Sequence, residues 1–220
     1  MKKKNSMPID MLHFEQQLWK QGFSRVMGLD EVGRGCLAGP VVAAGVILPD
    51  DFNCAGITDS KQIPTHALRC QVAERIRKEA VFYAVKECSP QEIDTHNILQ
   101  ASFLAMQKCV EAADPTPDFL LVDGNRFTAS LIPYECVVKG DTRSASIAAA
   151  SILAKVYRDE LMYSMHQLYP WYGWDTNVGY PTRTHYAGLE ACGISPLHRR
   201  SFRLRTDKVL TTAPRNGYES

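Results

Sequence analysis

Four carboxylates follow apolar stretches of this sequence and carry its most informative chemistry. Asp30 and Glu31 come directly after an apolar segment, Asp123 follows FLLV, and Asp141 ends the segment YECVVKGD. Ligand sites in open α/β sheets lie outside the carboxyl ends of the strands, so we expect these acids to converge. Converging carboxylates repel one another unless a cation lies between them, and an oxygen-only set suits Mg²⁺ or Mn²⁺ rather than zinc. Two such ions about 4 Å apart can hold the attacking and leaving oxygens of a phosphoryl transfer.

A plainer interpretation stays open for each acid. An acid at the end of a strand is often only a turn residue, which applies to Asp123 before Gly124 and more strongly to Asp141. It explains the adjacent pair Asp30 and Glu31 less well. That pair raises a geometric question, because neighbours on a regular strand point to opposite faces of the sheet. Glycines shortly after the pair make a departure from strand geometry cheap.

The pattern around these acids predicts one mixed α/β sheet with helices on its faces. The expected strands are 24–31, 41–48, 81–87, 118–124 and 134–141. The expected helices are 8–20, 64–80, one that follows Ser89 and runs to about residue 113, the Ala-rich 144–168, and 184–192. Ser89, Pro90 and Glu92 form a capping-box pattern, and Ser144 is expected to cap the long helix.

Length, composition and cysteine usage favour a cytoplasmic protein of one domain, which we take to be a monomer. The chain has 220 residues, 45% of them hydrophobic, and a formal net charge of +1. Its seven cysteines are widely spaced, which indicates reduced thiols rather than a zinc site or a disulfide framework. No apolar run approaches the roughly 18 residues that a membrane span needs. We expect a domain over 1–205, with a helical part from about 170 to 205 and a polar tail over 206–220.

Basic residues concentrate between Pro181 and Arg205, where Glu190 is the single acid. They are Arg183, His185, His198, Arg199, Arg200, Arg203 and Arg205. The arginines over 199–205 are either a solvated face or contacts to phosphate, which position a nucleic acid without reading its sequence. His185 either contacts substrate or has a structural role near the start of a helix.

Seven ordered blocks between residues 28 and 202 resemble bacterial type 2 ribonuclease H, or ribonuclease HII. They are GLDEVGRGCLAGPVVAAGVILP, ITDSK, NILQASFLAM, LLVDGN, VVKGDTRSASIAAASILAKVYRD, VGYPT with His185, and HRRSF. The first and fifth blocks are long and specific, whereas ITDSK or VGYPT alone would be weak. The resemblance covers about four-fifths of the chain.

The resemblance implies a ribonuclease H-like mixed five-stranded sheet and an endoribonuclease that acts on RNA–DNA hybrids and on duplex DNA containing ribonucleotides. It implies hydrolysis with two divalent ions, Mg²⁺ or Mn²⁺, that leaves a 5′-phosphate and a 3′-hydroxyl. The metal-binding and catalytic residues it implies are Asp30, Glu31, Asp123 and Asp141. The substrate-binding residues it implies are Gly33, Arg34 and Gly35 around the ribose 2′-OH, Tyr180 on the sugar of the following deoxynucleotide, and Lys61 on backbone phosphate. The 2′-OH is the group that separates RNA from DNA.

Two residues depart from the family pattern, and three rival interpretations compete with this one. Cys36 stands where the family usually has Pro, and Arg203 follows Phe202 where the family continues into a small residue and Pro.

A type 3 ribonuclease H is disfavoured, since that group carries an extra N-terminal domain and its glycine loop usually lacks the arginine. A generic Mg²⁺-dependent nuclease would lack the ribose requirement. A catalytically inactive hybrid-binding module would lose the metal acids, and all four are present.

Overall fold

A mixed five-stranded sheet forms the centre of the protein, as the sequence pattern and the resemblance imply. The computed structural model describes residues 10–57, 60 and 63–204. Its strands are β1 (Val26–Val32), β2 (Val41–Ile47), β3 (Phe82–Cys88), β4 (Phe119–Asp123) and β5 (Tyr134–Val137). They lie in the order β3-β2-β1-β4-β5. β2 is antiparallel to β1 and to β3, whereas β4 and β5 run parallel to β1.

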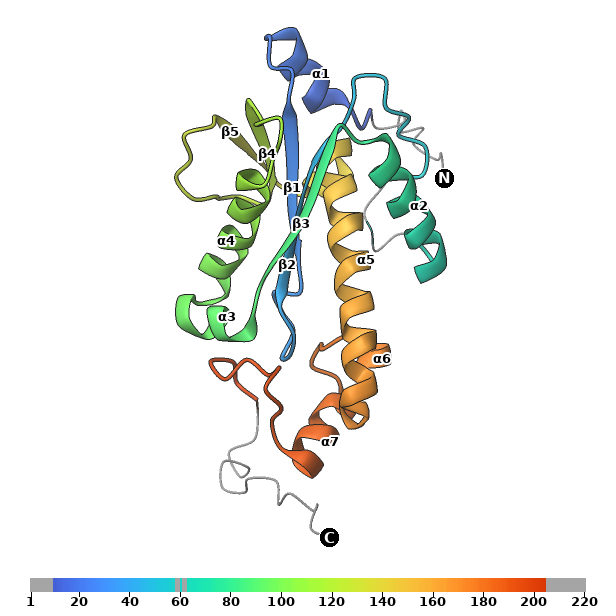
Figure 1. Ribbon diagram of the computed structural model, residues 1–220, viewed down its shortest axis with the longest axis vertical. Helices are drawn as coiled ribbons and strands as arrows, with labels where there is room; N and C mark the ends of the chain where they lie inside the picture. Colours follow the sequence, from blue (N-terminus) through green and yellow to red (C-terminus); the bar gives the residue numbers. More distant parts are fainter. Residues whose placement is uncertain (1–9, 58–59, 61–62, 205–220) are drawn as a thin grey trace, which may run out of the picture.

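Helices cover both faces of this sheet. They are α1 (His13–Lys20), α2 (His66–Glu79), α3 (Pro90–His96), α4 (Ile98–Glu111), α5 (Ala145–Leu168), α6 (Trp174–Asn177) and α7 (Arg183–Cys192), with short 3₁₀ turns over Gly140–Thr142 (η1) and Pro170–Tyr172 (η2). Figure 1 shows α4 on one side of the sheet and α5 with α2 on the other. No helix in the described part of the chain is long and apolar enough to cross a membrane.

Alternating side chains of the central strands supply the two halves of the core. Val42, Ala44 and Val46 pack with α5, whereas Met27 and Leu29 pack with α4. α5 lies unusually close to the sheet, because a Cβ on Gly28 would come within 2.2 Å of the Ser146 carbonyl carbon. The small residues of β1 and of the Ala-rich helix therefore fix where α5 crosses the strand that carries Asp30.

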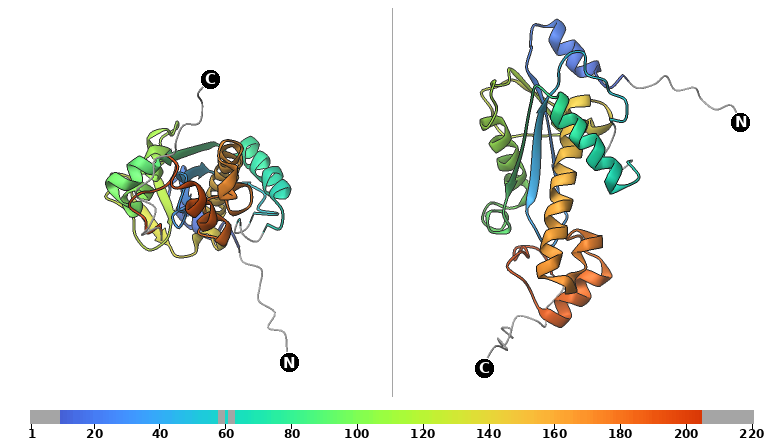
Figure 2. Two further views of the ribbon diagram at one scale, coloured as in Figure 1. Left: turned by 90° about the horizontal axis from the view of Figure 1, so that it is seen from below. Right: turned by 45° about the vertical axis from the view of Figure 1, so that its right-hand side comes forward.

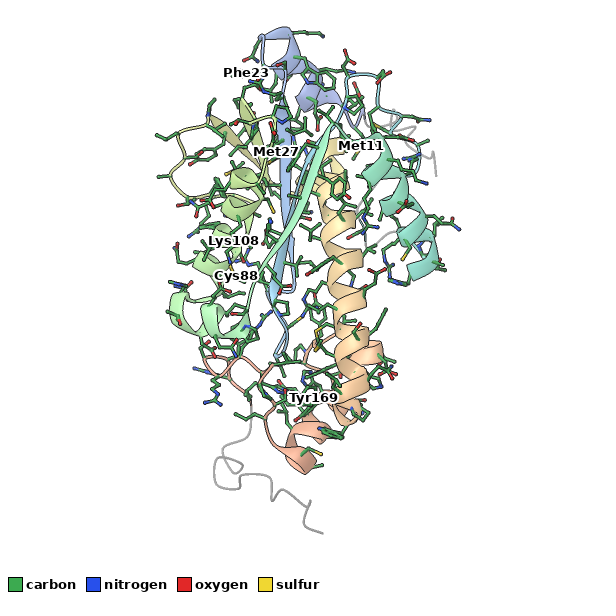
Figure 3. The ribbon with its side chains drawn as sticks, in the orientation of Figure 1. Met11, Phe23, Met27, Cys88, Lys108 and Tyr169 are labelled. Atoms are coloured by element: carbon green, nitrogen blue, oxygen red, sulfur yellow. The ribbon has the colours of Figure 1, made fainter. Side chains whose placement is uncertain are left out.

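The expected single helix after Ser89 is two helices, which corrects the sequence-based prediction. The capping box forms as expected, with Glu92 N–H donating to Ser89 Oγ and Ser89 N–H donating to the Glu92 carboxylate. At Asn97 the chain turns to a φ of +66°, and the Asn97 side chain caps α4 by accepting from Leu99 and Gln100 N–H. At φ 66° and ψ 162° Asn97 adopts a conformation that few residues other than glycine take, and its side-chain cap on α4 offsets part of that strain. Figure 3 shows the other anchor of α4, Lys108, whose ammonium donates to the Glu87 carbonyl beside Cys88.

The C-terminal helical part packs around the end of α5, at the opposite end of the sheet from α1 (Figure 2). Tyr172 and Trp174 stack with a centroid distance of 4.9 Å, and Tyr169 packs beside them (Figure 3). This part also meets the loop between β1 and β2 through an isolated bridge of Ala38 with His198. The expected polar tail over 206–220 lies outside the described residues.

Candidate active site

The first two acids lie where β1 runs past the end of its neighbour. Pairing of β1 with β4 stops at Leu29 opposite Val122, whereas pairing with β2 continues to Val32 opposite Val42. Asp30 and Glu31 therefore border a side of β1 that β4 no longer covers. Neighbours on a strand point to opposite faces, but at an open edge both side chains can reach around into the same space.

The two carboxylates use this edge in different ways. Asp30 is 7% exposed, and its carboxyl is hydrogen-bonded to Ser151 on α5 and to the Glu31 N–H at 2.7 Å. Glu31 accepts from Arg34 Nη1 at 3.0 Å. Both line one cavity of about 410 Å³, so the structure answers the geometric question raised by the sequence.

Asp123 and Asp141 line the same cavity. Asp123 is the last residue of β4, and its Oδ1 accepts from Gly140 N–H at 2.7 Å, which joins the end of β4 to the η1 turn. Asp141 lies within η1 rather than at a strand end, because β5 stops at Val137. That corrects the expected strand over 134–141. The left-handed conformation of Lys139 turns the chain out of the strand toward α5.

The electrostatics of the cavity call for a cation. Burial raises the pKa of Asp30 well above its usual range, and the charges of Glu31 and Asp123 raise it further. Burial also raises the pKa of Glu31, although the Arg34 guanidinium opposes that rise. A divalent cation among these oxygens would offset both the burial and the mutual repulsion. The four predicted ligands supply only oxygens, and these hard donors fit Mg²⁺ or Mn²⁺.

The two glycines beside Arg34 have different roles. Gly33 is buried with φ +93°, and a Cβ there would overlap the Arg158 side chain at 2.2 Å from Nε. Gly35 is exposed, and a Cβ there would meet only Tyr180 Cε1, at an ordinary 3.9 Å. The fold itself therefore requires glycine at 33 and leaves room for a side chain at 35.

Two buried arginines hold the loop over 33–40 by its backbone carbonyls. Arg158 of α5 donates to Ala38, Pro40 and Val178 carbonyls at 2.8–3.0 Å. Arg199 donates to the Gly39 and Arg34 carbonyls, each at 3.0 Å. Both side chains are fully buried, and their hydrogen bonds go to backbone carbonyls rather than to carboxylates. Arg199 Nη2 has no hydrogen-bond partner among the described residues.

Arg199 was expected in a solvated or phosphate-contacting run, and its burial corrects that prediction. Its neighbour Arg200 is exposed. His185 is also fully buried: its Nδ1 lies 3.0 Å from the Tyr180 carbonyl and its Nε2 lies 3.0 Å from His198 Nε2. The structural interpretation of His185 is therefore the one that the packing favours.

Tyr180 also lines the cavity of the four acids Asp30, Glu31, Asp123 and Asp141 (the acid cavity), and it is 39% exposed. Its backbone N–H donates to the Asn177 carbonyl at 2.8 Å, and its side chain is hydrogen-bonded to Cys36, which lies buried beneath it. Cys36 N–H also donates to the Gly33 carbonyl at 3.3 Å, a bond that the proline usual at this position could not make. The departure at Cys36 thus adds one hydrogen bond inside the loop and a contact to Tyr180.

Sequence reasoning missed three polar residues of the cavity: Ser60, Ser151 and Lys155. Ser60 Oγ lies 3.2 Å from Ser151 Oγ, and Lys155 donates to Asp159 at 2.7 Å. The signal was present, since Ser151 and Lys155 are four apart in an otherwise apolar stretch and so share one helix face. Lys61 lies outside the described residues, next to Ser60.

Comparisons with known proteins agree with this arrangement. Residues 27–205 match the family model described as ribonuclease HII. Ribonuclease HII of Salinibacter ruber is 51% identical over 201 residues, which are 90% of this chain and 100% of that protein.

Two solved structures share the fold. The crystal structure of ribonuclease H2 from Pyrococcus horikoshii has a TM-score of 0.70 and 24% identity, covering 82% of this chain and 94% of that one. Bst-RNase HIII in complex with Mn²⁺ has a TM-score of 0.63 and 20% identity, covering 92% of this chain and 73% of that one. The chain therefore belongs to the ribonuclease HII family, the metal-dependent endoribonucleases that cleave RNA in RNA–DNA hybrids and at ribonucleotides embedded in DNA.

Proposed function

We propose that Asp30, Glu31, Asp123 and Asp141 form the hydrolytic centre of this enzyme and hold two divalent ions, Mg²⁺ or Mn²⁺. The observation that carries the proposal is the shared cavity of four acids, in which burial and like charges disfavour the ionised form of Asp30. The Mn²⁺ bound by Bst-RNase HIII, a protein of the same fold, is consistent with this choice of ion. Divalent ions in such a site stabilise charge on the phosphoryl oxygens and lower the pKa of water.

The chain's own residues orient the substrate and limit the motion of the acids. Ser151 and the Glu31 N–H orient the Asp30 carboxyl, and Gly140 N–H orients Asp123. Lys155 lines the cavity and can approach a phosphate oxygen, with Asp159 holding its ammonium near α5. Prearranged groups of this kind need no reorganisation when the substrate binds.

Selection for ribose is assigned in this proposal to Gly35, Arg34 and Tyr180. Gly35 has an ordinary backbone and room for a side chain, so the fold gives no reason for glycine there. Close approach of a ligand to the backbone is the remaining physical reason. In the proposal, the loop backbone contacts the 2′-OH, the Tyr180 ring packs on the sugar of the next deoxynucleotide on the 3′ side, and Gly33 keeps the loop packed on Arg158.

Cleavage is proposed at the phosphodiester on the 5′ side of the ribonucleotide, giving a 5′-phosphate and a 3′-hydroxyl. The partner is then an RNA–DNA hybrid or a DNA duplex that contains a ribonucleotide, bound by a monomer. A location in the cytoplasm and a single domain over 1–205 also stay predictions. A type 3 enzyme is the weaker alternative, because the family model and a relative of 51% identity are both of ribonuclease HII.

Cleavage of a duplex with one embedded ribonucleotide, against the same duplex in all-DNA form, tests the proposal. With Mg²⁺ or Mn²⁺ we expect a cut at the ribonucleotide only, and Asp30→Asn or Asp123→Asn should lower the rate by about a hundredfold or more, as for other lost electrostatic contributions. Asp51→Asn, which changes an exposed acid, is the matched control. Equal cutting of both duplexes, or a full rate in Asp30→Asn, would contradict the assignment.

A further inference from the structure

A second cavity of about 250 Å³ lies beside the acid cavity. Glu31 and Asp123 line both cavities, so these two carboxylates form their shared wall. Arg34 and the segment after β4, Gly124, Asn125 and Arg126, also line the second cavity. Its remaining wall is apolar and comes from α4, with Leu99, Phe103 and Met106.

The lining combines cations with an apolar surface. Arg126 is exposed, and within the described part of the chain it has no hydrogen bond or ion pair. Arg34 is the other cation, and its side chain is held only by Glu31 among the described residues. Guanidinium groups suit phosphate oxygens, and an apolar wall suits the carbon face of a sugar. The lining therefore fits one sugar–phosphate unit of a nucleic acid strand.

The position of the second cavity relative to the acids indicates on which side of the scissile phosphate it lies. Tyr180 and Asp141 line the acid cavity but not the second one, whereas Arg34 and Arg126 line the second cavity but not the acid cavity. A strand with its scissile phosphate among the acids, and with one neighbour toward Tyr180, extends on its other side past Glu31 and Asp123. On that side the next phosphate comes near Arg34 and Arg126, whose positive charges attract it.

We propose that the second cavity binds the nucleotide on the 5′ side of the scissile phosphate, with Arg126 contacting its phosphate and the Leu99 and Phe103 side chains contacting its sugar. This inference rests on the proposed function, which assigns Tyr180 to the 3′ side. Contacts to phosphate position a strand without reading its sequence, so the cavity accepts either a ribonucleotide or a deoxynucleotide.

Arg126→Gln tests the phosphate contact. On a duplex with one ribonucleotide in a long DNA context, we expect KM to rise about tenfold while the single-turnover rate at saturation changes by less than about twofold. The slope of log Kd against log salt should fall by about one unit. Lys78→Ala removes a charge from a side chain that is 72% exposed on α2, and serves as the control with no change in KM.

Substrates shortened on one side of the scissile phosphate locate the contact. The rise in KM caused by Arg126→Gln should vanish on a substrate that ends, on the 5′ side of the scissile phosphate, at the first nucleotide and lacks that nucleotide's own 5′-phosphate. The rise should persist on a substrate that is shortened equally on the 3′ side. An equal effect on both shortened substrates would overturn the inference in favour of a general electrostatic role. The inference is also overturned if the KM of Arg126→Gln equals that of the wild-type protein while the wild-type protein cuts only at the ribonucleotide. If wild-type protein cuts all-DNA duplex equally, the proposed function itself fails, and the two failures are distinguishable.

Discussion

Arg34 Nη1 lies 3.0 Å from Glu31 Oε1, so the glycine loop and the acid cluster are joined by an ion pair three residues apart. The side chain of Glu31 is 11% exposed and that of Arg34 is 49% exposed. Glu31 lies in the wall between the two cavities, whereas Arg34 lines the second cavity alone. In the proposed metal site the same carboxylate would bind a metal ion, so the ion pair with Arg34 would compete with that ion.

Arg34→Gln is expected to tighten metal binding while impairing cleavage at a ribonucleotide. Loss of a partly exposed ion pair leaves Glu31 more available, an effect of about 0.4–1 kcal/mol, or about two- to fivefold in the midpoint Mn²⁺ concentration. The midpoint is measured from the Mn²⁺ dependence of thermal unfolding, which does not need activity. A higher midpoint Mn²⁺ concentration in the variant would show that Arg34 favours binding of the ion rather than competing with it.

Gly35→Ala and Gly33→Ala form a matched pair that separates fold from function. Gly35→Ala should leave Tm within about 2 °C of the wild type, because its Cβ has room, yet should lower cleavage at an embedded ribonucleotide by about a hundredfold, since a contact made at the reacting sugar is lost. Gly33→Ala combines a positive φ with overlap on Arg158, and should cost about 2–5 kcal/mol. For a chain of this size that is a fall in Tm of about 5–15 °C. A fully active Gly35→Ala protein would remove the loop backbone from ribose recognition.

Arg199→Lys should weaken both stability and substrate binding. A lysine cannot reach the Gly39 and Arg34 carbonyls together, and an unmade hydrogen bond to a buried group costs about 1.5–3 kcal/mol. Because the Arg34 carbonyl loses its donor, we expect KM for the ribonucleotide duplex to rise as well. Calorimetry and steady-state kinetics measure the two effects, with exposed Arg200→Lys as the control. A fall in Tm with an unchanged KM would mean that Arg199 stabilises the fold without positioning the loop.

His198 gives stability a dependence on pH. Burial, with a smaller contribution from the charge of His185, lowers the pKa of His198 from 6.5 to about 3. The Ser195 N–H donates to its Nδ1, so a proton there would break that bond. A group whose folded pKa is depressed contributes stability that is complete above pH 6.5 and is lost as pH falls from 6.5 toward 3.

At pH 5 this loss amounts to about 2 kcal/mol. Denaturant unfolding at pH 7, 6 and 5 should show the decline in the wild type and a smaller decline in His198→Asn. The acid cluster is common to both proteins and responds in the opposite direction. His185, whose pKa burial also lowers, is likewise present in both, so the difference between the two curves reports on His198. The pKa of Glu92 is lowered from 4.5 to about 2, so its effect on stability appears mainly below pH 4.5, outside the measured range of pH 5 to 7. Parallel pH curves would contradict the assignment.

Much of the fold could be predicted from local pattern. The apolar run VVAAGVIL indicated β2, and the Ala-rich stretch indicated α5 to within one residue at its start. Ser89 and Ser144 cap their helices as expected, because a capping side chain and its backbone partner are only three residues apart. The break at Asn97 was missed, since neither a glycine nor a proline marks it.

The sequence by itself determined the chemistry of this protein: which residue types follow the strands, and that they are carboxylates next to glycines and an arginine. The tertiary structure decided how they meet. Pairing with β4 ends before Asp30, so that Asp30 and Glu31 both border one cavity, and Asp141 enters from a turn rather than from a strand. Arg199 is buried against loop carbonyls far away in the sequence. Register, burial and such contacts depend on segments that meet only in the folded chain, so no local pattern carries them.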